Sequence, residues 1–165
     1  MAVAVAMMVA VAGCGMNSRT VAGTAAASQP SAAISRIGSP VRDGGFEFAV
    51  RDVSQVHQVG DPKDPGLSIT ARGVFVVVTL SIRNVGNAAV TFFDNYQTLI
   101  DSSGNRYSAS MAADIYGNLG IHSTKIAPGD QLVVHIAFDV PEGTVPANLS
   151  LRESSSSSGV TVPIS

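Results

Sequence analysis

Several residue types are scarce in this 165-residue chain, and each scarcity excludes a class of protein. The single cysteine, Cys14, excludes an intrachain disulfide, so a folded region must be held together by its apolar core. Tryptophan is absent and aromatic residues make up only 5%, which leaves few platforms for stacking bases or sugars. Charged residues make up 13% and the formal net charge is -2, so the basic footprint of a nucleic-acid-binding protein is missing. We therefore expect no nucleic-acid partner.

The N-terminal apolar run is too short to span a membrane. Residues 1–12 read MAVAVAMMVAVA, whereas a membrane-spanning helix needs about 20 apolar residues. A run of this length is typical of the central region of a signal peptide. No Lys or Arg precedes it, although signal peptides begin with a positive segment, so we expect that the native start lies upstream or that the chain is shortened.

The four residues Val11-Ala12-Gly13-Cys14 resemble a bacterial lipobox, in which an aliphatic residue and two small residues precede a cysteine. The resemblance implies that the Cys14 thiol receives a diacylglyceryl group and that a dedicated peptidase cuts between Gly13 and Cys14. Two or more acyl chains would then anchor the protein stably to a membrane. The alternative is that residues 1–14 form a buried segment with a free thiol. We expect the lipid anchor and an extracytoplasmic location at the cell membrane. Whether some molecules are released into the medium stays open.

Composition divides the chain into three parts. Residues 1–13 are the predicted lipoprotein signal peptide. Residues 14–40 contain the lipidated cysteine and a stretch rich in Ala, Ser, Gly, Thr and Pro without a sustained apolar period, which predicts a flexible tether. Residues 41–165 are the predicted folded domain.

The pattern from Val41 onward indicates β-structure. The strongest predicted strand runs from Val74 to Arg83, and a second apolar alternation covers residues 132–140. Further short strands are predicted at residues 46–51, 88–93, 96–101, 105–110, 149–152 and 160–164, separated by turn residues such as Pro128-Gly129. Residues 111–125 are poorly patterned and are expected to form a loop, with or without a helical turn. Seven or eight short strands predict an all-β fold, an antiparallel β-sandwich.

Three segments also resemble a known family. GVFVVVTLSIRNVGNAAVTF, LIDSSGNRYSAS and IAPGDQLVVHIAFDVPEG are similar to the core of an immunoglobulin-like domain family of unknown function. That family occurs in actinobacterial and firmicute lipoproteins and is related to secreted immunoprotective antigens of mycobacteria. The resemblance covers roughly residues 41–165 and implies an immunoglobulin-like sandwich. Its motifs are structural, so it implies no catalytic residues.

The candidate metal-binding residues lack the spacing of a metal site. His57, His122 and His135 are far apart in sequence, and a copper site would need the cysteine that the lipid occupies. Asp61 and Asp64 flank a Pro-Lys pair and would hold calcium only if a second loop supplied oxygens; turn formation is the preferred interpretation. We therefore predict no metal and no cofactor.

Neither a nucleophile motif nor a phosphate loop is present. The run Ser154 to Ser158 is interpreted as a flexible loop, because it lacks the Gly-x-Ser-x-Gly pattern of a nucleophile elbow. Tyr96, Tyr107 and Tyr116 are the candidate binding surface, since tyrosine combines an apolar ring with a polar tip.

These observations favour a non-enzymatic, membrane-anchored binding module of the cell envelope, with an envelope protein or a small ligand as its partner. Two alternatives stay open at this point. One is an envelope hydrolase or transferase with a loop-built site, because catalytic residues that are distant in sequence can meet in space. The other is a structural or immune-exposed surface antigen.

Overall fold

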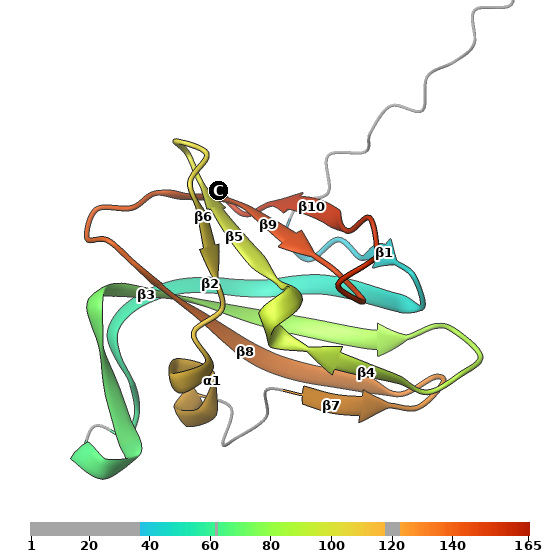
Figure 1. Ribbon diagram of the computed structural model, residues 1–165, viewed down its shortest axis with the longest axis horizontal. Coiled ribbons are helices and arrows are strands. Elements are labelled where there is room, and N and C mark those ends of the chain that lie inside the picture. Colours follow the sequence, from blue (N-terminus) through green and yellow to red (C-terminus); the bar gives the residue numbers. More distant parts are fainter. Residues whose placement is uncertain (1–36, 62, 118–122) are drawn as a thin grey trace, which may run out of the picture. The chain divides into compact units, whose positions relative to one another are not determined.

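The computed structural model describes residues 37–61, 63–117 and 123–165. The elements, in chain order, are β1 (Val41–Asp43), β2 (Phe46–Gly60), the 3-10 helix η1 (Pro65–Leu67), β3 (Ser68–Asn84), β4 (Val90–Phe93), the 3-10 helix η2 (Asp94–Tyr96), β5 (Thr98–Asp101), β6 (Arg106–Ser108), α1 (Met111–Gly117), β7 (Ser123–Ile126), β8 (Gln131–Val140), β9 (Pro146–Leu151) and β10 (Val160–Pro163). Figure 1 shows their arrangement.

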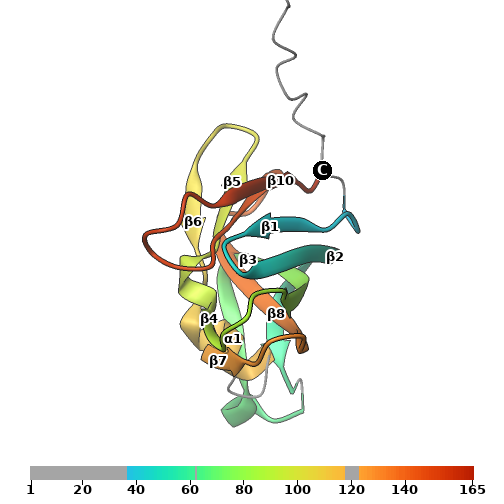
Figure 2. The ribbon, with the colours of Figure 1, turned by 90° about the vertical axis from the view of Figure 1, so that its right-hand side faces the viewer.

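The strands form antiparallel sheets, which confirms the predicted all-β sandwich. One sheet has the strand order β1-β2-β3-β8 and the other the order β10-β9-β5-β6, while β4 and β7 form a two-stranded ribbon. Figure 2 shows β2, β3 and β8 on one side of the domain and β5 and β10 on the other.

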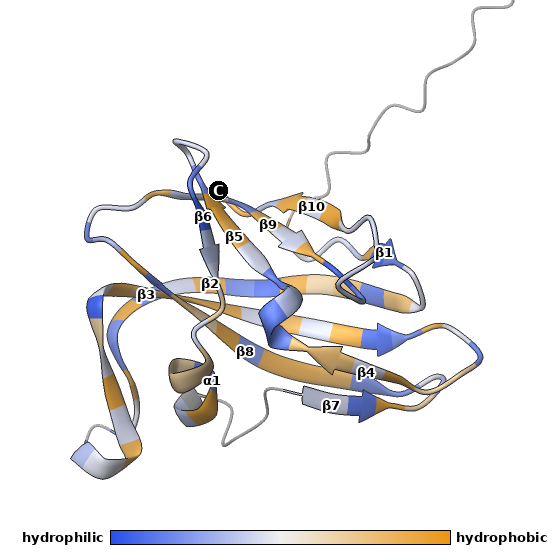
Figure 3. Cartoon of the chain, in the orientation of Figure 1, coloured by the Kyte–Doolittle hydropathy of each residue, from blue (hydrophilic) through white to orange (hydrophobic). Residues whose placement is uncertain are grey.

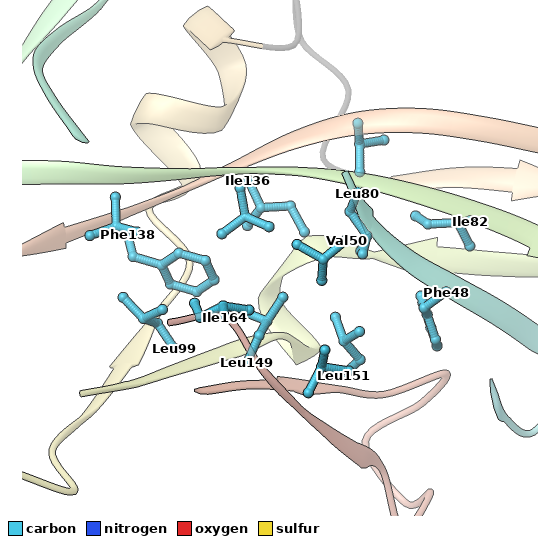
Figure 4. Packing of buried hydrophobic residues seen from close by; sticks show 14 of the residues in the cluster. Phe48, Val50, Leu80, Ile82, Leu99, Ile136, Phe138, Leu149, Leu151 and Ile164 are labelled. Atoms are coloured by element: carbon cyan, nitrogen blue, oxygen red, sulfur yellow. The ribbon is translucent and has the colours of Figure 1, made fainter. Parts of the chain in front are cut away.

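The core lies between the two sheets because apolar side chains alternate along the central strands. On β3 the alternate residues Val76, Val78, Leu80 and Ile82 are fully buried, and β8 pairs with β3 from Val74–Val140 to Arg83–Gln131. Figure 4 shows Leu80, Ile136 and Phe138 facing Leu99, Leu149 and Leu151 of the second sheet. Each buried side chain of this size contributes about 1.5–3 kcal/mol, so this layer supplies most of the stability of a domain without a disulfide.

The β2–β3 hairpin extends beyond the sandwich as an arm, defined here as residues 56–72. At the base of the arm the β2–β3 register shifts between Val56 and Gln58, which pair with Phe75 and Thr70. The shift accommodates three extra β3 residues and bends the hairpin (Figure 1). At the tip, the Asp61 carboxylate accepts from the Lys63 N–H, and the Asp64 carboxylate accepts from the Gly66 N–H. Both aspartates are therefore turn residues, as the preferred interpretation of this loop predicts.

Residues 111–125 differ from the expected loop. The structure forms the helix α1 there and then the strand β7, which pairs with β4 from Phe93–Ser123 to Val90–Ile126. The β2 strand is also longer than predicted, ending at Gly60 instead of residue 51, because its outer half is polar and exposed and carries little apolar alternation.

The serine run forms a hydrogen-bonded turn between β9 and β10. The Asp43 carboxylate accepts from the backbone N–H of Glu153 and of Gly159, the residues that flank the run. Burial alone would raise the pKa of Asp43, but these bonds and one from the Ser157 hydroxyl hold that pKa below its usual value. The ionised carboxylate thereby joins β1 to the second sheet.

A buried amide provides a second polar connection. Gln97 is fully buried between η2 and β5; its Nε2 donates to Phe93 O at 2.9 Å and to Arg152 O at 3.0 Å. Its Oε1 accepts from the Arg152 N–H at 2.9 Å. These bonds satisfy three backbone groups at the end of β4 and just after β9.

We predict that Gln97→Leu lowers the free energy of unfolding by about 2–4 kcal/mol, since leucine leaves those buried backbone groups without partners. Urea unfolding followed by circular dichroism measures the change. Gln58→Leu, at an exposed position of β2, is the matched control and should shift the midpoint little. A Gln97→Leu protein as stable as the control would contradict the structural role assigned to this amide.

Candidate functional site

An open cleft of about 420 Å³ lies where the arm leaves the sandwich. It is lined by Arg72 and Gly73 at the bend of β3 and by residues 139–142, where β8 ends. The two segments approach closely at Gly73, where an added Cβ would lie 2.3 Å from Val140 O. Glycine at this position therefore allows β3 to bend against the end of β8, and that bend forms the cleft.

Charged side chains surround the cleft. The Arg72 Nε donates to Asp139 Oδ2 at 3.1 Å, while the Arg72 side chain remains 93% exposed. His57 of β2 lies on the rim, with its Nδ1 3.3 Å from Gly73 O and 3.9 Å from Glu142 Oε2. Because Arg72 contacts Asp139 through one edge of the guanidinium, its terminal amino groups face solvent and can bind an anionic or carbonyl oxygen of a ligand.

Helix α1 covers the outer face of the first sheet near the cleft. Ala113 is fully buried against Phe75 of β3 and Ala137 of β8. Half-buried side chains of the arm and of β3 extend this second apolar cluster, and they are Val56, Val59, Ile69 and Ala71 of the arm and Val77 of β3. Leu67, Met111 and Ile115 on η1 and α1 are exposed, and Figure 3 shows hydrophobic positions along the arm and on α1.

Asp114 fixes α1 to the sheet through the backbone of β8. Its Oδ1 accepts from the Ala137 N–H, and the Ser110 N–H donates to Ala137 O at 2.7 Å. Both backbone groups of Ala137 on the side away from β3 are thus used. The Asp114 side chain also contacts the Asp94 carboxyl of η2, and both residues are buried.

The environment of Asp114 favours its neutral form. Burial raises the pKa of this carboxyl to about 8, and the neighbouring Asp94 adds to the rise, while the bond from the Ala137 N–H acts in the opposite direction. Asp114 was missed by the sequence analysis. The residue that could have pointed to a helix here is Ser110, because its Oγ accepts from the Ala113 N–H as a helix N-cap residue.

The three predicted binding tyrosines lie on three elements, and all are partly exposed. Tyr96 of η2 packs against Phe93, with ring centroids 5.3 Å apart. Tyr107 of β6 packs against the core, and its hydroxyl donates to Asp101 Oδ2. Tyr116 lies on α1. Two of the three rings are thus engaged in local contacts, and a binding role for the set stays a prediction.

The Asp101 carboxylate organises the β5–β6 turn. It accepts from the side chain and the backbone N–H of Asn105, from the Ser103 N–H and from the Tyr107 hydroxyl. These bonds, that of the Asn105 side chain foremost, hold the pKa of Asp101 below its usual value. Asp101 is therefore a turn residue of the β5–β6 hairpin.

The predicted lipid-bearing Cys14 and the cleavage position after Gly13 lie outside the described residues, as does most of the predicted tether. Its last residues, 37–40, are described and exposed, and the Gly38 N–H donates to Val50 O. In the described ranges, no helix has the length and apolar character needed to cross a membrane. Within the same ranges, no three His, Cys, Asp or Glu side chains are grouped to hold a metal ion.

Solved structures share this fold at low sequence identity. MPT63, a secreted protein from Mycobacterium tuberculosis, is 17% identical with a TM-score of 0.58, covering 78% of this chain and 94% of MPT63. The yjhA protein from Bacillus subtilis is 13% identical with a TM-score of 0.55, covering 79% and 99% of the two chains. At such identities the likeness establishes the sandwich fold alone.

A candidate lipoprotein from Bacillus subtilis, ycdA, is 15% identical with a TM-score of 0.53; the match covers 75% of this chain and 38% of ycdA. No curated protein matches the sequence. The family model described as "Domain of unknown function (DUF4352)" matches residues 35–161, which include nearly the whole sandwich. The chain therefore belongs to the DUF4352 family.

Proposed function

We propose that this protein is a lipid-anchored extracytoplasmic binding module whose ligand site is the cleft between the bend of β3 and the end of β8. The observation that carries the proposal is the cleft itself, in which Arg72 holds an exposed guanidinium beside backbone from two segments distant in sequence. A volume of about 420 Å³ falls in the range of small-molecule sites.

The anchor rests on the lipobox-like residues Val11 to Cys14 that follow an uncharged apolar run. Similarity in fold to a secreted protein and to a candidate lipoprotein supports an extracytoplasmic role. A lipid on Cys14 would leave residues 15–40 as a spacer, which as a coil would span roughly 25–30 Å between the membrane and the domain.

Binding is favoured over catalysis by the chemistry of the cleft. Its lining side chains include a guanidinium and two carboxylates but no serine, threonine, cysteine or lysine that would act as a nucleophile. His57 and Glu142 on the rim are each 70% exposed, so both are hydrated and neither is held in a fixed reacting geometry. A ligand with a carboxylate or phosphate oxygen for Arg72 fits this site best.

The anchor predicts that Cys14→Ser leaves the precursor uncut and unlipidated. In bacterial cells that perform lipoprotein maturation, the wild-type protein should enter the detergent phase and the membrane fraction, and the variant should lose that lipid-dependent partitioning. The control Ser28→Ala, in the predicted spacer, should behave as wild type. Mass spectrometry tests the claim directly: a mature wild-type N-terminus bearing an unmodified Cys14 would refute it.

The cleft predicts binding of small anionic ligands at Arg72. Nuclear magnetic resonance titration with acetate, N-acetylated amino acids, dipeptides, amino sugars and inorganic phosphate should shift the amides of Arg72, Gly73 and Val140 with at least one compound. Arg72→Ala should weaken that binding by about ten- to a hundredfold, as expected for loss of a charge-assisted hydrogen bond.

Arg42→Ala is the matched control, since Arg42 is also exposed and paired with a carboxylate, that of Glu47. Equal weakening by both variants, or shifts confined to other surfaces, would count against the cleft. Consumption of a compound during the titration would support the hydrolase or transferase alternative instead. Lack of any response across the panel would favour a display role as a surface antigen.

A further inference from the structure

Helix α1 covers the edge of the first sheet that β8 forms. The β8 strand lies at the end of the order β1-β2-β3-β8, so one side of its backbone has no partner strand in that sheet. At Ala137 this side is covered by α1 and the residue before it, through the bonds to the Asp114 carboxyl and the Ser110 N–H. Exposed edges recruit other strands, and covering them is a common protection.

The carboxyl that makes this bond sits beside another carboxyl. Asp114 is 1% exposed and Asp94 is 5% exposed, and their side chains interact. Apart from that interaction, no donor of the described residues reaches Asp114 Oδ2. Two buried carboxylates in contact repel strongly. The pair is therefore stable when one carboxyl is protonated and donates its O–H to the other.

The surfaces packed against α1 are mainly apolar. The arm contributes Val56, Val59, Ile69 and Ala71, and β3 contributes Phe75 and Val77. The ionisable groups on the same face of the described strands are His135 and Asp139 of β8, each two residues from Ala137, with Arg42 of β1, Glu47 and Asp52 of β2, and Arg72 and Arg83 of β3. Asp139 is paired with Arg72, and His135 bonds Thr79 through its Nδ1. Asp94 is therefore the ionisable group in direct contact with Asp114.

We propose that α1 is a latch on the β8 edge that opens when the Asp94–Asp114 pair loses its shared proton. Opening would free the backbone N–H and C=O of Ala137 and uncover Phe75. Those groups form an unpaired strand edge beside an apolar side chain, which is the surface that an added β-strand binds. The latch would make access to that edge depend on pH.

The direction of the pH dependence follows from proton linkage. The pKa of Asp114 is about 8 when α1 is docked, against 3.8 for an ordinary aspartate exposed by undocking. The docked form thus binds more protons between these values, and docking is most stable below pH 3.8. The free energy that favours docking of α1 falls as the pH rises to about 8, and above that pH it stays constant.

Hydrogen exchange of the Ala137 amide tests the latch. Protection factors, corrected for the intrinsic exchange rate at each pH, give the opening equilibrium. For the wild type this equilibrium should rise on the order of tenfold per pH unit between pH 5 and 7, the limit for one linked proton. Core amides of β3, such as that of Leu80, should change far less over the same range.

Asp114→Asn should abolish most of that dependence. Asparagine retains an oxygen for the Ala137 N–H and gains an N–H for the Asp94 carboxylate, so the latch stays closed without a shared proton. Asp94→Asn is the second variant, in case the first does not fold, and should also flatten the profile. Asp52→Asn, at an exposed position, should keep the wild-type slope.

Three results would overturn the proposal. The wild-type Ala137 protection factor would be independent of pH, or both asparagine variants would keep the wild-type slope, or Leu80 would lose protection in parallel with Ala137. The last result would mean that protons are linked to unfolding of the whole domain instead of to α1.

Discussion

Pairing of β3 with β8, and burial of the apolar side chains that both strands direct toward the second sheet, is the constraint on which the rest of the structure depends. With one cysteine in the whole chain, the domain has no internal disulfide, and this layer must offset the entropy of folding. Ten consecutive residue pairs, from Val74–Val140 to Arg83–Gln131, hold the two strands in register. The position of each peripheral feature follows from this pair. The cleft lies where β3 bends and β8 ends, and α1 covers the outer edge of β8.

Polar side chains are buried at strand ends and at a sheet edge, where backbone groups need hydrogen-bond partners that the apolar core does not provide. Gln97 and Asp43 satisfy backbone groups at the ends of strands, and both connect segments more than 50 residues apart. Asp114 does the same for β8 but in a different electrostatic setting, since its neighbour is a second carboxyl. A buried amide is insensitive to pH, whereas a buried carboxyl pair is not. The Gln97 connection should therefore be equally stable at all pH values, whereas the Asp114 connection should depend on pH.

Much of the fold could be predicted from the sequence, because period-two alternation is strong in the strands that face the core. Val74 to Arg83 and residues 132–140 were predicted within a few residues of their observed ends, apart from the arm. The arm was missed because it carries exposed polar residues such as His57 and Gln58, and its apolar side chains belong to the cluster with Ala113 of α1 instead of the sandwich core. The α1 helix was foreseen only as a helical turn within a loop, because its seven residues show too little period. The cleft was missed because Arg72 and Asp139 are 67 residues apart and meet only through the β3–β8 register.

The cleft and the α1 latch both lie on parts that surround the sandwich core, so the molecule divides into a stable core and a functional periphery. The most direct measurement of that division is native-state hydrogen exchange at several sub-denaturing urea concentrations. The account predicts that amides of β3 and β8 in the core, such as those of Val78 and Ile136, exchange only through global unfolding. Amides of α1 and of the arm tip should exchange through local openings with little urea dependence. Uniform exchange of all these amides through one global event would contradict the account, because the arm and α1 would then be as firmly held as the core.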